Sequence, residues 1–121
     1  MTPTEIIDHY CSVWCEPDPG KRAALLAPIW ATGATYSDPA IHAVGAEGLL
    51  GYIAAMTARY PGARIDRTSA VDLHHDVARF AWRATSTDGS LALDGIDIAF
   101  IDPERAQITR IIGFFGPLAA S

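Results

Sequence analysis

The spacing of the apolar residues changes midway along the chain, and this change constrains the fold more than any other feature. In the first half, apolar residues such as Ile7, Tyr10 and Trp14 recur every three or four positions, which is the period of a helix with one buried face. From Ala63 onward the period is two, which is typical of strands. Helices followed by strands within 121 residues predict a single α+β domain over residues 1–121, with the helices packed on one face of a sheet.

Three helices are expected. Thr2 and Glu5 have the spacing of a capping box at the start of the first helix. Asp18 and Pro19 are a start signal for the second helix, and Pro28 favours a kink or an early end within it. The third helix is expected over residues 45–60. The apolar faces consist of Ile7, Tyr10, Cys11 and Trp14 in the first helix, Leu25, Leu26, Ile29 and Trp30 in the second, and Leu49, Leu50, Ile53 and Met56 in the third.

The strands are expected to form an antiparallel meander, because the connections between them are short and two are rich in turn residues. The first of its connections, His74 to Asp76, is expected to be a hairpin turn and no metal site, since adjacent residues of a strand point to opposite faces. The predicted strands are Ala34–Ser37, Arg64–Leu73, Val77–Thr85, Leu91–Ile101 and Gln107–Phe115. The last two are apolar on both faces, so a homodimer formed through the sheet is expected to cover the second face.

The charge and the cysteines limit the partners and the location. The formal net charge is −5 and nine basic residues are scattered along the chain, which argues against nucleic acid and membrane surfaces as partners. The beginning of the chain lacks the basic region of a signal peptide, and no apolar stretch is long enough to span a membrane. Cys11 and Cys15 have only His9 beside them, so they are expected to be free thiols rather than metal ligands. Free thiols favour a reducing compartment, the cytoplasm.

Asp97 is the residue that points most directly to chemistry. It lies within Leu91–Ile101, a run in which eight of eleven residues are apolar. An ionised carboxylate without partners is unfavourable there, and the usual outcome is a raised pKa or a strong hydrogen bond. The alternative is a structural ion pair, for which Arg79, Arg83 and Arg110 are available. Asp94, three residues earlier, faces the opposite side of the sheet, so only one of the two aspartates points inward.

The order of these features resembles the NTF2-like superfamily, and within it the SnoaL-like and ketosteroid-isomerase-like branch. The resemblance covers the whole chain and rests on Trp30, on Tyr36–Pro39 (Tyr-Ser-Asp-Pro), and on Gly113–Gly116 (Gly-Phe-Phe-Gly) near the end. It implies a cone in which three N-terminal helices pack on a curved, mostly antiparallel sheet. An apolar pocket would lie between them, usually in a homodimer.

The resemblance also implies a candidate catalytic site. Asp38, just before a proline, matches the general base of ketosteroid isomerases, and Asp97 matches a neutral acid that donates to an oxyanion, with glycine replacing a proline two residues before it. Tyr10 matches the third member if residues 16–20 lengthen the loop between the helices. For Asp38 the alternative is a turn aspartate, since Asp-Pro is common in turns. The expected pocket lining is Trp14, Trp30, Tyr36, Met56, Trp82 and Phe114.

These residues predict a cofactor-independent enzyme without a metal. It would transfer a proton next to the carbonyl of a small apolar ligand, as an isomerase or a polyketide-cyclase-like enzyme. The alternative is a non-catalytic module of the same fold that binds a small molecule or dimerises, since one fold hosts many functions.

Overall fold

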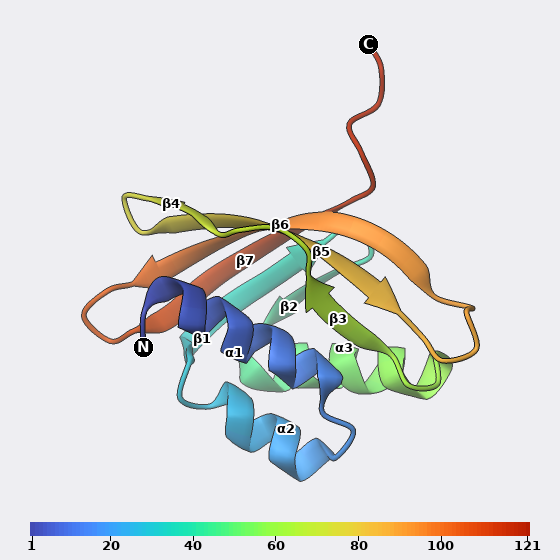
Figure 1. Ribbon diagram of the computed structural model, residues 1–121. Helices are drawn as coiled ribbons and strands as arrows, with labels where there is room; N and C mark the ends of the chain where they lie inside the picture. Colours follow the sequence, from blue (N-terminus) through green and yellow to red (C-terminus); the bar gives the residue numbers. More distant parts are fainter.

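Three helices lie on one side of a seven-stranded sheet in the computed structural model, which describes residues 1–121 (Figure 1). The first and third helices contact the sheet, and the second packs on these two helices. The α+β class predicted from the sequence is confirmed. In chain order the elements are α1 (Pro3–Cys15), α2 (Pro19–Leu26), β1 (Trp30–Asp38), β2 (Ile41–Val44), α3 (Gly45–Arg59), β3 (Arg64–Arg67), β4 (Asp72–His74), β5 (Val77–Thr85), β6 (Ala92–Asp102) and β7 (Gln107–Phe115).

The sheet is mixed and unclosed. Its strand order is β2-β1-β7-β6-β5-β3, and β4 pairs with β5 beside β3. All neighbouring strands are antiparallel except β1 and β7, which run parallel although they come from opposite ends of the chain. The end of β1, the last part of β7 and the middle of β6 therefore lie side by side, and these segments carry the candidate site.

The helix predictions are correct in number, and the early end expected at Pro28 is confirmed, but two details are wrong. The capping box at Thr2 forms, with reciprocal hydrogen bonds to Glu5. The second helix ends at Leu26, because Pro28 has no N–H with which to continue it, so Ile29 is not helical and Trp30 begins β1. The third helix follows β1 and β2, so the helices are not all N-terminal to the sheet.

The strand predictions are confirmed for Val77–Thr85 and Gln107–Phe115. The segment Arg64–Leu73 is two short strands rather than one, because Ser69 interrupts the pairing: its hydroxyl accepts the backbone N–H of Ala81 at 2.8 Å. The connection after His74 is a two-residue hairpin turn as predicted. His75 and Asp76 have φ of 47° and 63°, as such turns require.

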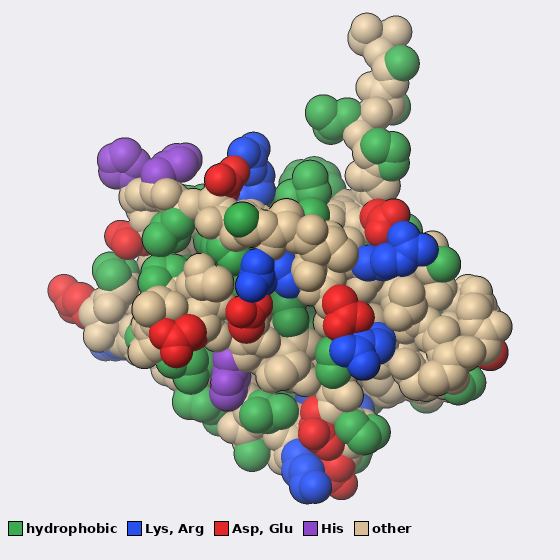
Figure 2. Space-filling model, viewed as in Figure 1, with side chains coloured by type: hydrophobic (Ala, Val, Ile, Leu, Met, Phe, Trp, Pro, Cys, Tyr) green, Lys and Arg blue, Asp and Glu red, His purple; other side chains and the backbone are tan.

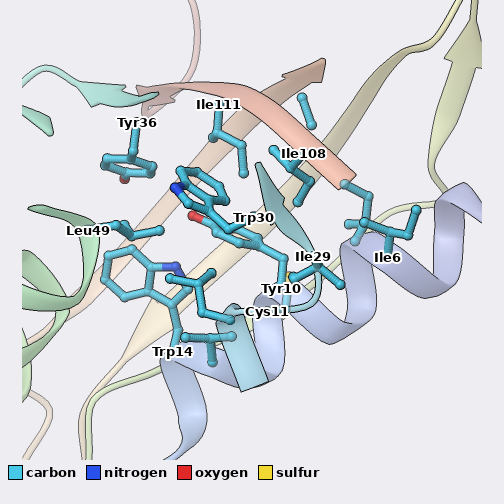
Figure 3. Packing of buried hydrophobic residues seen from close by; sticks show 14 of the residues in the cluster. Ile6, Tyr10, Cys11, Trp14, Ile29, Trp30, Tyr36, Leu49, Ile108 and Ile111 are labelled. Atoms are coloured by element: carbon cyan, nitrogen blue, oxygen red, sulfur yellow. The ribbon is translucent and has the colours of Figure 1, made fainter. Parts of the chain in front are cut away.

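The core lies between the helices and the sheet. Tyr10 and Trp14 of α1 point towards Trp30 and Tyr36 of β1, and Ile108 and Ile111 of β7 pack beside them (Figure 3). The Tyr10 and Trp30 rings stack with centroids 6.1 Å apart. On the surface shown in Figure 2, acidic and basic side chains are interspersed rather than gathered by sign. No helix is both long and apolar enough to cross a membrane.

Candidate functional site

A small apolar cavity lies between α1, α3 and the sheet. Eleven of its thirteen lining residues are hydrophobic, and the other two are Asp38 and Asp97. Its volume is about 40 Å³, which is room for a few water molecules. Two acidic groups enclosed by apolar and aromatic side chains are the most unusual feature of the interior.

Asp38 ends β1 with every acceptor position of its carboxyl group filled. Oδ1 accepts the backbone N–H groups of Ala40 and Ile41, at 2.8 and 3.1 Å, which is the turn geometry expected of an aspartate before proline. Oδ2 accepts the hydroxyls of Tyr36 and Tyr52, at 2.7 and 2.9 Å. Four donors and no acceptor around the carboxyl fit its ionised form. Asp38 is therefore a turn residue and also a cavity residue.

The two tyrosines remain protonated donors. Burial raises the pKa of the Tyr36 phenol above its ordinary value, and the charges of neighbouring groups, including Asp38, add to the rise. Burial likewise raises the pKa of Tyr52, followed by its hydrogen bond to Asp38. Tyr52 is only half-buried, so of the two donors to Oδ2 it is the one with room to move.

Asp97 is buried, with 5% of its surface exposed, and has no cationic partner. Its Oδ1 accepts the indole N–H of Trp82 at 2.8 Å. Burial raises its pKa to about 7; the Trp82 hydrogen bond opposes the rise, and the negative charge of Asp38 adds to it. The group is therefore poised to be neutral or charged near neutral pH.

The ion-pair alternative for Asp97 is wrong. Arg79 pairs with Asp72 at 2.6 Å and Arg83 pairs with Asp94 at 3.1 Å, and all four side chains are exposed. The guanidinium of Arg110 lies over the ring of Phe100. Asp94 faces outward, so Asp97 is the aspartate of β6 that faces the cavity.

Gly113 separates the two carboxyl groups. It lies on β7, between β1 and β6, and is paired directly with Asp97. A Cβ atom at this position would be 2.7 Å from Oδ1 of Asp97 and 3.6 Å from Cβ of Asp38. Because glycine has no side chain, the two acids approach one another from either side of β7 without an intervening group.

Tyr10 enters the same cavity from α1. Its side chain is buried, and burial raises its pKa well above the ordinary value, with the charge of Asp97 as the next cause. The indole N–H of Trp14 is close to the Tyr10 hydroxyl but makes no hydrogen bond, and it is sealed from solvent. The core beside the cavity therefore contains an unpartnered donor, which is rare in a protein interior.

A solved structure decides the family. The chain is similar to a candidate isomerase of the SnoaL-like family from Agrobacterium tumefaciens, with 30% identity, a TM-score of 0.85, and 94% of this chain and 97% of that chain covered. The protein belongs to the SnoaL-like family. More distant structures are similar to this SnoaL-like protein in fold, and at their low sequence identity the similarity extends to the fold alone.

One is a candidate polyketide cyclase from Sinorhizobium meliloti, with 13% identity, a TM-score of 0.73, and coverage of 90% of this chain and 93% of that chain. Another is a protein of ketosteroid isomerase-like fold from Catenulispora acidiphila in complex with trimethylamine, with 18% identity, a TM-score of 0.74, and coverage of 96% and 88%. No family model matches the sequence, and no curated protein matches it significantly.

Most residues expected in the pocket of the SnoaL-like protein do line the cavity: Asp38, Asp97, Tyr10, Trp14, Tyr36, Met56 and Trp82. Trp30 does not; it is stacked on Tyr10 in the core. Phe114 was predicted on the wrong face, since it is 58% exposed and its neighbour Phe115 lines the cavity. The cause is a β-bulge: Arg110 pairs with Phe100 and Ile108 with Ile101, so Thr109 is left over and the alternation of β7 is reversed beyond it.

Tyr52 and Gly113 are the site residues that the sequence did not identify. Tyr52 lies one helical turn before Met56, and that spacing is a signal that would have found it. No local pattern identifies Gly113, because its role arises from pairing with β1 and β6.

Proposed function

We propose that this SnoaL-like protein is a cofactor-independent enzyme that transfers a proton next to the carbonyl group of a small apolar compound, by isomerisation or aldol-type cyclisation. One observation carries the proposal. A fully hydrogen-bonded carboxylate and a buried acid with a pKa of about 7 meet across Gly113 in one apolar cavity. Pairs of acids whose environments differ in this way divide the roles of base and acid between them.

In this proposal Asp38 is the base and Asp97 is the hydrogen-bond donor. Asp38 takes the proton from the carbon next to the carbonyl, and the electron pair of the broken C–H bond moves into the enolate. Asp97, protonated, donates from Oδ2 to the developing oxyanion, since its Oδ1 already accepts from Trp82. Tyr10 is a further donor in the cavity wall.

Proton transfer to Asp38 requires a free acceptor position, and all four are filled in the resting structure. Its two backbone donors are fixed by the turn. Tyr52 is half-buried, so we propose that substrate displaces its hydroxyl from Oδ2 and uses the vacated lone pair. The same displacement would enlarge a cavity of about 40 Å³, which is far below the several hundred Å³ typical of ligand pockets.

The experiment is exchange of ketone α-protons with deuterated solvent, followed by NMR over a panel of small cyclic and linear ketones. Asp38→Asn and Asp97→Ala should each lower the exchange rate by about a hundredfold or more. Asp97→Asn should retain part of the rate, because an amide still donates. Asp94→Asn is the matched control on the outer face of the same strand and should exchange at the wild-type rate. Full activity in both the Asp38 and the Asp97 variants would overturn the assignment.

The second candidate is a non-catalytic module that binds a small molecule or dimerises. The small volume of the cavity favours it, because a side-chain-filled interior needs no substrate. This candidate predicts no exchange above the solvent rate for any ketone, together with no effect of Asp38→Asn.

The partner that we propose for the outer face of the sheet is a second copy of the chain. Ile96 and Phe114 are direct neighbours on β6 and β7, and they are 42% and 58% exposed. Ile98 and Ile112 form the next pair along and are half-buried. A twofold axis through this face would bury both pairs against their own copies.

The location that we propose is the cytoplasm. Cys11 and Cys15 are both free thiols, and Cys15 donates to the backbone carbonyl of Ile65 instead of forming a disulfide. Unpaired cysteines of this kind are typical of a reducing compartment.

A further inference from the structure

A second hollow, larger than the aspartate cavity, opens at the surface where the α1–α2 junction, α3 and the start of β3 meet. Its volume is about 490 Å³. The charged residues in its wall are Arg22, Arg64 and Glu16, so cationic side chains outnumber anionic ones in a chain whose net charge is −5. We call this hollow the Arg22 groove.

Arg22 is the unusual member of this wall, because it is a buried cation without a carboxylate partner. Only 3% of its surface is exposed. Nε donates to the backbone carbonyl of Glu16 at 3.0 Å and Nη2 donates to that of Pro17 at 3.4 Å. Buried arginines are ordinarily paired with an anion, because removing a charge from water is costly. Here the chain supplies only two carbonyl dipoles.

The third nitrogen of Arg22, Nη1, has no partner within the chain. Two side-chain nitrogens without a hydrogen bond are sealed from solvent, those of Trp14 and Trp30. Nη1 of Arg22 also lacks a hydrogen bond but is not sealed, so solvent reaches it. The small exposed part of Arg22 therefore includes Nη1, in the wall of the groove. The neighbouring Arg64 is already paired with Asp66 at 2.7 Å, and Glu16 accepts the backbone N–H of Asp18. Arg22 is the cation with unused donors.

An apolar slot of about 30 Å³ lies between the Arg22 groove and the aspartate cavity and shares lining residues with both. Thr57, Ala63 and Arg64 line both the groove and the slot. Trp14, Met56 and Ile65 line both the slot and the aspartate cavity. A cationic groove, an apolar slot and the acid–base cavity thus lie in this order, and each shares wall residues with the next.

We infer that the Arg22 groove binds the carboxylate of an amphipathic substrate, whose apolar chain passes through the slot and places a carbonyl group between Asp38 and Asp97. The substrate class is a keto acid with an apolar spacer between its two functional groups. The position of the carbonyl rests on the function proposed above, whereas binding of the carboxylate at Arg22 does not. A guanidinium binds a carboxylate through charge-assisted hydrogen bonds, which are stronger than those to a neutral ester.

The test uses three keto acids of increasing spacer length, 4-oxopentanoate, 6-oxoheptanoate and 8-oxononanoate, and the methyl ester of each. Affinity is measured by NMR titration of the ¹⁵N-labelled full chain, and α-proton exchange is measured on the same samples. We expect at least one acid to bind about tenfold or more tightly than its ester, because a hydrogen bond to a charged group has this effect on affinity. Arg22→Gln should abolish the difference. Arg59→Gln, at the end of α3 outside the groove, should leave it unchanged.

Arg22 also holds the carbonyls after α1, so Arg22→Gln has a structural risk. The side-chain Nε–H signal of Arg22 in the wild-type protein provides a second measurement: it should shift with the acid and not with the ester. Equal affinity for acid and ester at every length, or an acid preference that survives Arg22→Gln, would overturn the inference.

The two proposals fail in different ways. Acid preference in binding, with no exchange and no effect of Asp38→Asn, would refute the enzyme and retain the anion site. Exchange that depends on Asp38 but is equal for acid and ester would retain the enzyme and refute the anion site.

Discussion

The indole N–H of Trp82 reaches the carboxyl of Asp97 across Gly95, the residue directly opposite Trp82 on β6. A Cβ atom at Gly95 would lie 2.1 Å from the Trp82 ring. The indole therefore lies flat over the strand only because position 95 has no side chain. Phe115 packs edge-on against the same ring, with centroids 6.0 Å apart, and fixes it in place. Trp82 thus holds Oδ1 of Asp97, and in the proposed mechanism it is a positioning residue that leaves Oδ2 free to donate.

Trp82→Phe should raise the pKa of Asp97 above about 7. The hydrogen bond from Trp82 stabilises the carboxylate and opposes the effect of burial, so its loss favours the neutral acid. The measurement is an NMR titration of the ¹³C-labelled aspartate side chains. Trp82→Phe should also shift the pH dependence of exchange to higher pH, an effect that a purely structural role of Trp82 would not produce. An unchanged or lower pKa would contradict this account.

The stability of the protein should fall as the pH rises from about 4 to about 7. The folded state holds the Asp97 proton up to a pKa of about 7, whereas an unfolded aspartate releases it near 3.8, so the folded state binds more protons in this interval. The loss across the interval is on the order of 4 kcal/mol. Urea unfolding of the wild type and of Asp97→Asn at a series of pH values measures it.

Asp97→Asn should remove most of this pH dependence, because the amide does not titrate. Asp94→Asn is the control, since Asp94 is exposed and paired with Arg83. It should retain the wild-type slope. A slope in Asp97→Asn equal to that of the wild type would mean that another group is responsible.

The sequence predicts those parts of the fold that depend on local signals. The capping box at Thr2, the period-two run of Val77–Thr85 and the turn after His74 each involve only neighbours along the chain, and all three are confirmed. The parallel pairing of β1 with β7 was not predicted, because it joins segments from opposite ends of the chain. A local pattern contains no information about such a pairing.

In the candidate site, too, local signals predict some features, and contacts between distant segments determine the rest. Alternation along β6 predicts that only one of Asp94 and Asp97 faces inward, and the structure identifies it as Asp97. The family resemblance pointed to Asp38. The error at Phe114 arose because one extra residue, Thr109, reverses the alternation, and no turn-forming residue marks it in the sequence. The donors to Asp38 come from β1 and from α3, so Tyr52 becomes part of the site only through tertiary packing.

Phe114→Asp should keep the protein monomeric if the outer face of the sheet is the proposed homodimer interface. The substitution places a charge beside Ile96, at the centre of the exposed apolar pair, where burial against a second copy would leave it unpaired. Sedimentation velocity over a range of concentrations measures the change. Leu118→Asp, in the fully exposed C-terminal tail, is the control and should not alter association. A monomeric wild type would refute the dimer.

Gly113→Ala should lower both the stability of the protein and its exchange rate. Gly51→Ala, the matched control in α3, should lower neither. The new methyl group at position 113 would sit 2.7 Å from Oδ1 of Asp97, so the carboxyl must move away from Trp82 or from the cavity. We expect a loss of about 1–3 kcal/mol in stability, typical of overpacking, together with a fall in exchange rate as large as that of Asp97→Ala. A Cβ atom at Gly51 in α3 would meet nothing within 4 Å, so alanine there should leave exchange unchanged and stabilise the helix by about 0.5–1 kcal/mol. Wild-type exchange in Gly113→Ala would show that the approach of the two acids across β7 is not required for turnover.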